Sequence, residues 1–441
     1  MMNKNIIVFE HSMLSCCDEQ CEQCQHKKNF VNEDNSCYCI LHCPKKYFEE
    51  LKDYCLKPEN KNCGFAYNYH KKGIIFSKYT GILQCSDGTY IEILPKTGKI
   101  TSIIKGRKVF ENLILSAHNL TKEYKQHEHI RSSVKKNSLI EIYISLFCHD
   151  LLTILKKGIK RTYIKQQGNI NIYKGKIKFN EHIKYNQVCK HKFFVEYNDF
   201  SMDIPENRIL KSACLVLLKK TTNQENKKIL LKFLLEFENI SCSNNLFSDF
   251  QTVSINRLHS YYARPIQYAE FFLKNEMFFP KHGKAKLLSL LFPLNEMFED
   301  YLEKVFMKLP DMKVKKQFSK YSLIKTKEKF LFQTKMDFFL TYEQKKIVLD
   351  AKWKLIDFSK ENYEVAQADL YQLFTYSEII QNKEVQNINQ QILIVLCYPK
   401  TDLFQEKVCW EFFNGKQVLL VPIDVSLKSY EQVEYIQQML I

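Results

Sequence analysis

The segment from Gln333 to Lys354 constrains the fold more than any other, because it is typical of two β-strands joined by a tight turn. Residues 334–341 and 346–354 are rich in β-branched, aromatic and apolar side chains, and the residues between them are polar. The segment therefore predicts an antiparallel β-hairpin that turns at Glu343-Gln344.

Such a hairpin brings three charged side chains together. With the turn at that position, Asp337 lies directly across from Asp350, and facing side chains are about 5 Å apart at Cβ. Because side chains alternate between the two faces of a strand, Lys352 points to the same side as Asp350, and Trp353 points to the other side. The sequence thus predicts a cluster of two aspartates and one lysine.

Two carboxylates at this distance repel each other unless a cation lies between them. Magnesium takes oxygen ligands, commonly one or two carboxylates with waters and phosphate oxygens, and it polarises phosphodiesters or activates water. Lys352 would orient that water or neutralise charge on the phosphorane. A solvated hairpin edge would carry the same residues, and structural ion pairs imitate active sites. The cluster alone therefore leaves a catalytic and a structural interpretation open.

The sequence around this hairpin predicts a mixed sheet with helices on its faces. Residues 293–306 have an amphipathic pattern, and its apolar stripe is bordered by Glu299, which would lean towards the sheet. Residues 365–381 predict a helix, and residues 391–398 predict a strand. A last hairpin is expected to turn at Asn414-Gly415.

The helix expected at 365–381 carries Asp369, Gln372 and Tyr376 on one face, since their spacing is i, i+3 and i+7. An amide and a phenol directed at the acidic cluster would suit contacts to a phosphate backbone.

The middle of the chain is mainly helical by its periodicity. A long helix at 139–155 should end at Gly158. Further helices are expected at three places, the last of them broken at Pro265: 206–220, 226–238 and 255–273.

Residues 173–192 form a basic segment with interleaved aromatic side chains. It contains Tyr173, Lys174, Lys176, Lys178, Phe179, Lys184, Tyr185, Lys190 and Lys192. Such a segment either binds phosphates or is a solvated basic face, and both interpretations remain open.

Residues 64–125 predict a small β-domain. Strands are expected at 73–76, 81–85 and 90–94, with a tight turn at Asp87-Gly88. Nothing in this region suggests catalysis.

Nine of the 16 cysteines lie in the segment 16–63. In a reducing compartment such density indicates metal binding rather than disulfides. Cys21 and Cys24 have the spacing with which two thiolates bind one zinc ion, and Cys39 and Cys43 would supply a second pair. The second pair does not repeat the first spacing, and other cysteines nearby compete as ligands. A structural Zn²⁺ and a zinc-free segment therefore both remain open.

The composition is that of a folded, basic protein. With 441 residues, of which 45% are hydrophobic, the chain can form two or three domains with cores of their own. Its formal charge of +16 favours polyanionic partners such as nucleic acid. The sequence shows no signal peptide and no apolar run of membrane-spanning length, so we expect a cytoplasmic protein with no membrane partner.

The ordered motifs of the C-terminal part resemble the PD-(D/E)xK nuclease superfamily. These are Glu299, Asp337, Asp350-Ala351-Lys352 and Gln372-x-x-x-Tyr376, the last being similar to the QxxxY motif of RecB-like nucleases. Four segments, within a resemblance that covers roughly residues 65–400, are similar to the McrC family of nuclease subunits of McrBC 5-methylcytosine restriction systems: YNDFSMDIPENRILKSACLVLLKK (197–220), NEMFEDYL (295–302), DAKWK (350–354) and ADLYQLFTYSE (368–378).

This resemblance implies a magnesium-dependent endonuclease that cleaves double-stranded DNA in phage defence. In the implied site, Asp337 and Asp350 bind Mg²⁺, Glu299 assists the metal, Lys352 is the catalytic lysine, and Gln372 and Tyr376 support the site. Members of the family bind a McrB-like AAA+ GTPase ring, stimulate its GTP hydrolysis through their N-terminal part, and cleave DNA after the ring translocates. McrB supplies the recognition of 5-methylcytosine.

Two features depart from the family pattern. Met336 stands where a proline is expected before the first acidic residue, and the cysteine-rich segment is not expected at all.

A standalone nuclease and a catalytically idle, GTPase-activating assembly factor remain alternatives. The absence of a P-loop motif argues against an internal NTPase of that type. Retention of both aspartates and Lys352 argues against an idle protein.

We therefore expect a multi-domain α/β protein. A β-rich domain at 1–125 would carry the cysteine-rich segment and contact the partner ring, and a mainly helical region would follow at 126–280. A nuclease domain with a mixed sheet would occupy residues 281–441.

Overall fold

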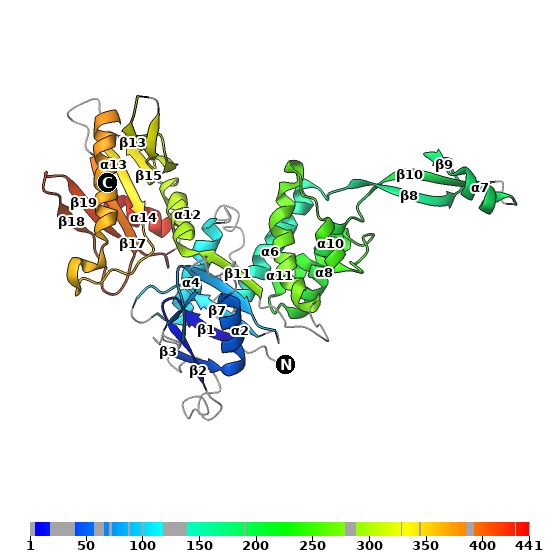
Figure 1. The fold of residues 1–441 in the computed structure, drawn as a ribbon, viewed down its shortest axis with the longest axis horizontal. Helices are drawn as coiled ribbons and strands as arrows, with labels where there is room; N and C mark the ends of the chain where they lie inside the picture. Colours follow the sequence, from blue (N-terminus) through cyan, green and yellow to red (C-terminus); the bar gives the residue numbers. More distant parts are fainter. Residues whose placement is uncertain are drawn as a thin grey trace. The chain divides into compact units, whose positions relative to one another are not determined.

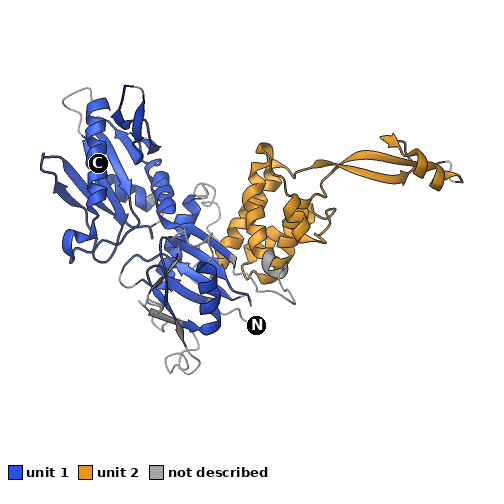
Figure 2. Cartoon of the chain, viewed as in Figure 1, with its two compact units in different colours: residues 1–139, 286–441 blue, residues 140–285 orange. Residues whose placement is uncertain are grey.

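A computed structural model of the chain contains two compact units (Figure 2). One unit consists of residues 1–139 and 286–441, and the other consists of residues 140–285. The regions expected at the two ends of the chain thus belong to one unit. The structure describes residues 5–17, 40–56, 66–69, 73–86, 89–98, 101–117, 139–188, 191–277, 288–327, 329–343, 345–384, 392–427 and 429–440.

The first sheet of the larger unit has the strand order β1-β7-β6-β11. Its strands are β1 (Asn5–Phe9), β6 (Tyr79–Gln84), β7 (Tyr90–Leu94) and β11 (Leu288–Pro293). β1 runs parallel to β7, whereas β6 is antiparallel to β7 and to β11. The close approach of β11 requires Gly81, which has a φ of +140° and whose added Cβ would lie 2.1 Å from the Leu290 carbonyl oxygen. The expected β6–β7 pair is confirmed, and its turn at Asp87-Gly88 lies outside the described residues.

A second four-stranded sheet has the order β3-β2-β5-β4. Its strands are β2 (Met13–Cys17), β3 (Ile40–Pro44), β4 (Ala66–Tyr69) and β5 (Gly73–Phe76). Two helices accompany the N-terminal sheets, α2 (Lys45–Cys55) and α4 (Ile103–Ala117). Phe48 and Leu51 of α2 join Ile74 and Phe76 of β5 in one buried apolar cluster, so the helix packs on this sheet through its apolar side.

The C-terminal part of the same unit contains a six-stranded mixed sheet of order β12-β15-β16-β17-β19-β18 (Figure 1). Its strands are β12 (Lys313–Phe318), β15 (Met336–Tyr342), β16 (Lys345–Ala351), β17 (Ile392–Pro399), β18 (Val408–Glu411) and β19 (Gln417–Ile423). Strands β16, β17 and β19 are parallel, and the other neighbouring pairs are antiparallel. This confirms the expected mixed α/β character and the last hairpin, whose Gly415 has the positive φ that its turn requires.

Three helices pack on or beside this sheet: α12 (Leu294–Phe306), α13 (Gln367–Glu384) and α14 (Ser429–Leu440). The expected apolar stripe of α12 is buried, and α12 packs against α4 and β12. α13 packs against β16 and β17. A separate two-stranded hairpin, β13 (Ser322–Lys325) with β14 (Phe330–Gln333), stands between β12 and β15 in the chain, and a 3-10 helix, η3 (Glu361–Glu364), precedes α13.

The smaller unit combines a helical core with a β-hairpin arm. Its helices are α6 (Leu139–Lys157), α7 (Phe179–Asn186), α8 (Pro205–Lys220), α9 (Gln224–Glu236), α10 (Leu246–Thr252), the 3-10 helix η2 (Arg257–Tyr262) and α11 (Ala263–Met277). Its strands are β8 (Thr162–Ile170), β9 (Lys176–Ile177) and β10 (Phe193–Ser201), paired in the order β8-β10-β9. The predicted end of the long helix is confirmed, since Gly158 follows α6 with a φ of +106°.

Two expectations for this unit need correction. The predicted break at Pro265 is wrong, because α11 begins at Ala263 and Pro265 lies in its first turn, where a missing N–H costs no helical hydrogen bond. The region is also less helical than expected, since the basic segment 173–192 lies between the two long strands of an arm. Within the described part of the chain, none of the helices has the length and apolar character needed to cross a bilayer.

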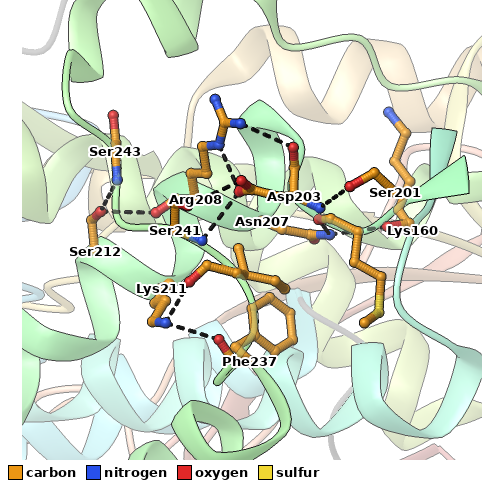
Figure 3. A network of polar contacts seen from close by, with 12 residues as sticks. Lys160, Ser201, Asp203, Asn207, Arg208, Lys211, Ser212, Phe237, Ser241 and Ser243 are labelled. Atoms are coloured by element: carbon orange, nitrogen blue, oxygen red, sulfur yellow. Dashed lines mark hydrogen bonds and ion pairs between the residues drawn. The ribbon is translucent and has the colours of Figure 1, made fainter. Parts of the chain in front are cut away.

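A polar network fixes the junction between β10 and α8 (Figure 3). Asp203 accepts a hydrogen bond from Arg208 Nε at 2.7 Å and two more from the Ser241 backbone N–H and hydroxyl. Asn207 donates to the Lys160 and Met202 carbonyl oxygens at 2.9 and 2.8 Å. The Arg208 contact is the main reason why the pKa of Asp203 is lowered. These groups of the segment 197–220 are engaged with one another, which indicates a structural role.

Candidate functional site

The hairpin β15–β16 adopts the register expected from the sequence. Its pairs run from Phe338 opposite Leu349 to Tyr342 opposite Lys345, and the next position in this register places Asp337 opposite Asp350. The Ala351 backbone N–H donates a 3.0 Å hydrogen bond to Asp337 Oδ2, which ties the first aspartate to the strand that carries the second. The structure therefore brings the two carboxylates together at one end of the sheet.

Asp350 is the buried member of this pair, with only 2% of its surface exposed. Burial, followed by the neighbouring Asp337 carboxylate, raises the pKa of Asp350 to about 7, and Lys352 opposes both effects. Asp350 Oδ2 lies 2.9 Å from Lys352 Nζ, which is an ion-pair distance, yet this oxygen is buried and accepts no hydrogen bond of good geometry. One carboxylate oxygen thus remains able to take a further ligand.

Lys352 follows directly after β16 and is held by both its backbone and its side chain. Its N–H donates a 3.0 Å hydrogen bond to the Cys397 carbonyl oxygen on β17. Its ammonium contacts Asp350 and lies 3.9 Å from Asp369 Oδ1. Burial alone would lower the pKa of Lys352, but the surrounding carboxylates outweigh it and leave the pKa raised. Lys352 is therefore a protonated donor at neutral pH.

Glu299 approaches the cluster from α12, as its place beside the apolar stripe suggested. Burial, followed by the charge of Asp337, raises the pKa of Glu299. Gln317 Nε2 donates a 2.6 Å hydrogen bond to Glu299 Oε2. Gln317 has a φ of +50° within strand β12, a conformation that is uncommon for a residue with a side chain and that recurs at functional sites. Sequence reasoning missed Gln317, and no local pattern could have indicated it.

Gln372 and Tyr376 support the backbone rather than the carboxylates. Gln372 Nε2 donates a 2.9 Å hydrogen bond to the Tyr376 hydroxyl, and this hydroxyl donates to the Lys335 carbonyl oxygen at 3.0 Å. Lys335 lies two residues before Asp337, at the entry to β15. The two side chains therefore fix the strand entry at which Met336 replaces the proline of the family pattern.

Trp353 points away from the cluster, towards the N-terminal sheets. Its indole Nε1–H donates a 2.6 Å hydrogen bond to Oε1 of Glu10, a residue that directly follows β1 and is 1% exposed. The indole also forms an edge-to-face contact with Phe298, the neighbour of Glu299. Sequence reasoning missed this contact, which links residues 343 positions apart and therefore leaves no trace in local periodicity.

The described part of the structure offers few protein ligands for a metal ion. Among the residues that the structure describes, no three His, Cys, Asp or Glu side chains lie together as a metal-binding group, so Glu299 does not join the two aspartates in such a group. Of the four cysteines proposed for zinc, Cys21, Cys24 and Cys39 lie outside the described residues, and the Cys43 side chain is buried in an apolar cluster.

Comparisons with solved structures show which proteins have this fold. A chain of the refined half-complex from the tetradecameric assembly of Thermococcus gammatolerans McrB AAA+ hexamers with bound McrC matches with a TM-score of 0.58 and 19% identity. The match covers 99% of this chain and 100% of that one. A chain of the cryo-EM structure of the Thermococcus gammatolerans McrBC complex matches with a TM-score of 0.43, 20% identity and coverage of 69% and 87%, respectively. At 19% identity the likeness to the first of these chains shows the fold alone.

Sequence comparisons identify the family. No curated protein matches this sequence. A sequence model of the McrBC 5-methylcytosine restriction system components matches residues 74–399, which include the whole Asp337, Asp350 and Lys352 cluster. The chain therefore belongs to the family of McrBC 5-methylcytosine restriction system components.

Proposed function

We propose that this protein is the endonuclease subunit of a McrBC-type restriction complex, with a PD-(D/E)xK nuclease site at one end of the six-stranded sheet. The observation that carries the proposal is the placement of Asp337 and Asp350 opposite each other, with Lys352 at 2.9 Å from Asp350. The bond to be broken is a phosphodiester of double-stranded DNA.

The residues present fit a magnesium ion. Two adjacent carboxylates, one with a buried oxygen that accepts no hydrogen bond, supply the small number of protein ligands that Mg²⁺ commonly takes. Among the described residues no third carboxylate joins the pair, so waters and substrate phosphate oxygens would complete the site. When bound, the ion would supply Lewis-acid polarisation of the scissile phosphate. Asp337 and Asp350 would hold it, and Glu299 would assist from α12.

Lys352 would stabilise the negative charge that develops on the phosphate during hydrolysis. Its raised pKa keeps the ammonium protonated, so it acts as a hydrogen-bond donor and a fixed positive charge and not as a general base. The contacts with Asp350 and Asp369 orient the ammonium before substrate binds. Gln372 and Tyr376 are positioning residues, since they hold the backbone that leads to Asp337 and make none of their described hydrogen bonds to the carboxylates.

The proposed partner is a McrB-like AAA+ GTPase ring. Support comes from the fold match to a chain of an assembly of McrB AAA+ hexamers with bound McrC. In this arrangement the ring would recognise 5-methylcytosine and move the DNA, and the chain described here would stimulate GTP hydrolysis and cut.

The direct test compares Asp350→Asn with Asp402→Asn in the complex with the AAA+ GTPase. Both substitutions remove one carboxylate, but Asp402 is exposed and lies outside the site. With GTP, Mg²⁺ and methylated DNA, Asp350→Asn should abolish cleavage while GTPase stimulation remains, and Asp402→Asn should cut normally. Undiminished cleavage by Asp350→Asn would overturn the assignment of the site. Cleavage by the unmodified chain without the ring and GTP would favour a standalone nuclease.

A further inference from the structure

The hairpin β13–β14 is an unusual element of the nuclease region. It forms a two-stranded sheet of its own, with Ser322 opposite Gln333 and Lys325 opposite Phe330, and it does not pair with the six-stranded sheet. An isolated two-stranded hairpin is marginally stable in water, so such an element usually gains stability from a partner or serves to contact one.

The apolar side chains of this hairpin are turned to solvent. Leu323 and Ile324 on β13 are 53% and 45% exposed, and Phe330 and Phe332 on β14 are 68% and 69% exposed. Because side chains alternate along a strand, Leu323 shares a face with Phe330 and Phe332, and Ile324 points to the other face. Three exposed apolar groups on one face form a patch of the kind that marks a binding surface. Phe332 also has a φ of +56°, a strained value for an aromatic residue in a strand.

The charge of the hairpin indicates which class of partner it binds. Residues 320–335 contain five lysines (Lys320, Lys325, Lys327, Lys329 and Lys335) and one acidic residue, Glu328. Lys325, Lys327 and Lys329 are exposed around the hairpin end, and no carboxylate of the described residues forms an ion pair with them. Lys325 Nζ lies 5.7 Å from the Phe330 ring centroid, so cationic and aromatic groups share one surface. This combination suits a nucleic-acid backbone better than a protein surface.

The base of the hairpin is fixed to the catalytic strand. The Thr334 N–H and hydroxyl both donate to the Tyr321 carbonyl oxygen at 2.8 Å, which closes the base. Tyr321 in turn contacts Glu384 at the end of α13 through its hydroxyl. The Tyr376 hydroxyl donates a hydrogen bond to the carbonyl oxygen of Lys335. Lys335 lies one residue beyond the base of the hairpin and two residues before Asp337. In Figure 1 the hairpin lies at the same end of the region as β15.

We propose that the β13–β14 hairpin binds the DNA duplex beside the scissile phosphate, with its lysines on phosphates and Phe330 and Phe332 against the groove. This rests on the proposed nuclease function for the identity of the substrate. A four-residue strand spans about 13 Å, which corresponds to about four base pairs at 3.4 Å each. The hairpin would therefore hold a short stretch of DNA in register with Asp337, which follows it in the chain.

The test measures DNA binding by the full chain without cleavage. A fluorescent duplex is titrated in EDTA at several salt concentrations, and Lys327→Ala/Lys329→Ala is compared with Lys108→Ala/Lys407→Ala, which removes two exposed lysines elsewhere in the same unit. The hairpin variant should lower the slope of log affinity against log salt by about 2 and weaken binding roughly tenfold per lysine at 0.1 M salt. The control variant should match the unmodified chain.

A second variant separates apolar from electrostatic contacts. Phe330→Ala should weaken binding about tenfold without changing the salt slope, because it removes no charge. Unchanged affinity and slope in both hairpin variants would overturn the proposal, as would a photoreactive group at position 330 that cross-links to the ring protein and not to DNA. Binding through the hairpin by a chain that never cuts would refute the nuclease proposal and leave this one standing.

Discussion

Glu10 offers a quantitative test of how the N-terminal sheets are joined to the segment that follows β16. Its carboxyl group is buried, Oε1 accepts the hydrogen bond from Trp353, and Oε2 is buried without a hydrogen-bond partner among the described residues. Burial raises the pKa of Glu10 from 4.5 to about 8, although the Trp353 hydrogen bond and Lys96 oppose the shift. Glu10 is therefore protonated in the folded protein at neutral pH.

The sign of the stability effect follows from this shift. Because the folded pKa lies above the unfolded value, the contribution of Glu10 to stability is fully present below pH 4.5 and is lost as the pH rises towards 8. At pH 7 ionisation of this carboxyl stabilises the unfolded state by about 3 kcal/mol, at 1.36 kcal/mol for each pH unit above 4.5. Glu10→Gln keeps the shape and the acceptor for Trp353 but cannot ionise. The variant should therefore be about 3 kcal/mol more stable than the unmodified protein at pH 7 and nearly equal to it at pH 4.

The assay is urea unfolding followed by tryptophan fluorescence. The chain has two tryptophans, so a Trp410→Phe background leaves Trp353, which touches Glu10, as the only indole. Glu411→Gln, at an exposed position of the same unit, is the matched control and should leave the pH dependence unchanged. If the Glu10→Gln protein loses as much stability between pH 4 and 7 as the unmodified protein does, ionisation of Glu10 is not the cause of that loss.

Three further predictions follow from the site and its supports. Tyr376→Phe removes three hydrogen bonds of a buried phenol and should cost about 1–3 kcal/mol in urea unfolding, with slower DNA cleavage; unchanged stability would contradict the positioning role. Gly81→Ala should lower the free energy of unfolding by about 3 kcal/mol or more, because its Cβ meets a backbone oxygen at 2.1 Å, whereas Gly168→Ala, with nothing within 4 Å, should stay within about 0.5 kcal/mol. Lys352→Met should reduce the single-turnover cleavage rate at least about a hundredfold and weaken DNA binding much less. Equal losses of cleavage rate and of DNA affinity would indicate that Lys352 serves binding instead.

The β15–β16 hairpin was predictable because its pattern is local and strong. Two apolar runs flank a short polar turn, and the position of that turn sets the register, which decides which carboxylates face each other. The helix carrying Glu299 was predictable for the same reason, since its apolar stripe repeats with the helical period and is buried as expected.

Other parts of the fold have no such pattern. Strand β8 of the arm is largely exposed and strand β10 is mostly half-buried, and neither shows the regular alternation of buried and exposed residues that identifies a strand packed on a core. Strands β13 and β14 are also largely exposed. The Glu10–Trp353 contact and the hydrogen bond of Gln317 depend on tertiary packing, which no short window of sequence encodes.

The most direct test of the proposed metal site is anomalous diffraction from crystals of this protein grown with Mn²⁺, which replaces Mg²⁺ in oxygen-ligand sites. We expect one strong peak at about 2.1 Å from carboxylate oxygens of both Asp337 and Asp350. We also expect this peak to disappear in Asp350→Asn crystals. Manganese bound elsewhere, or no peak between these two residues, would contradict the proposed nuclease site.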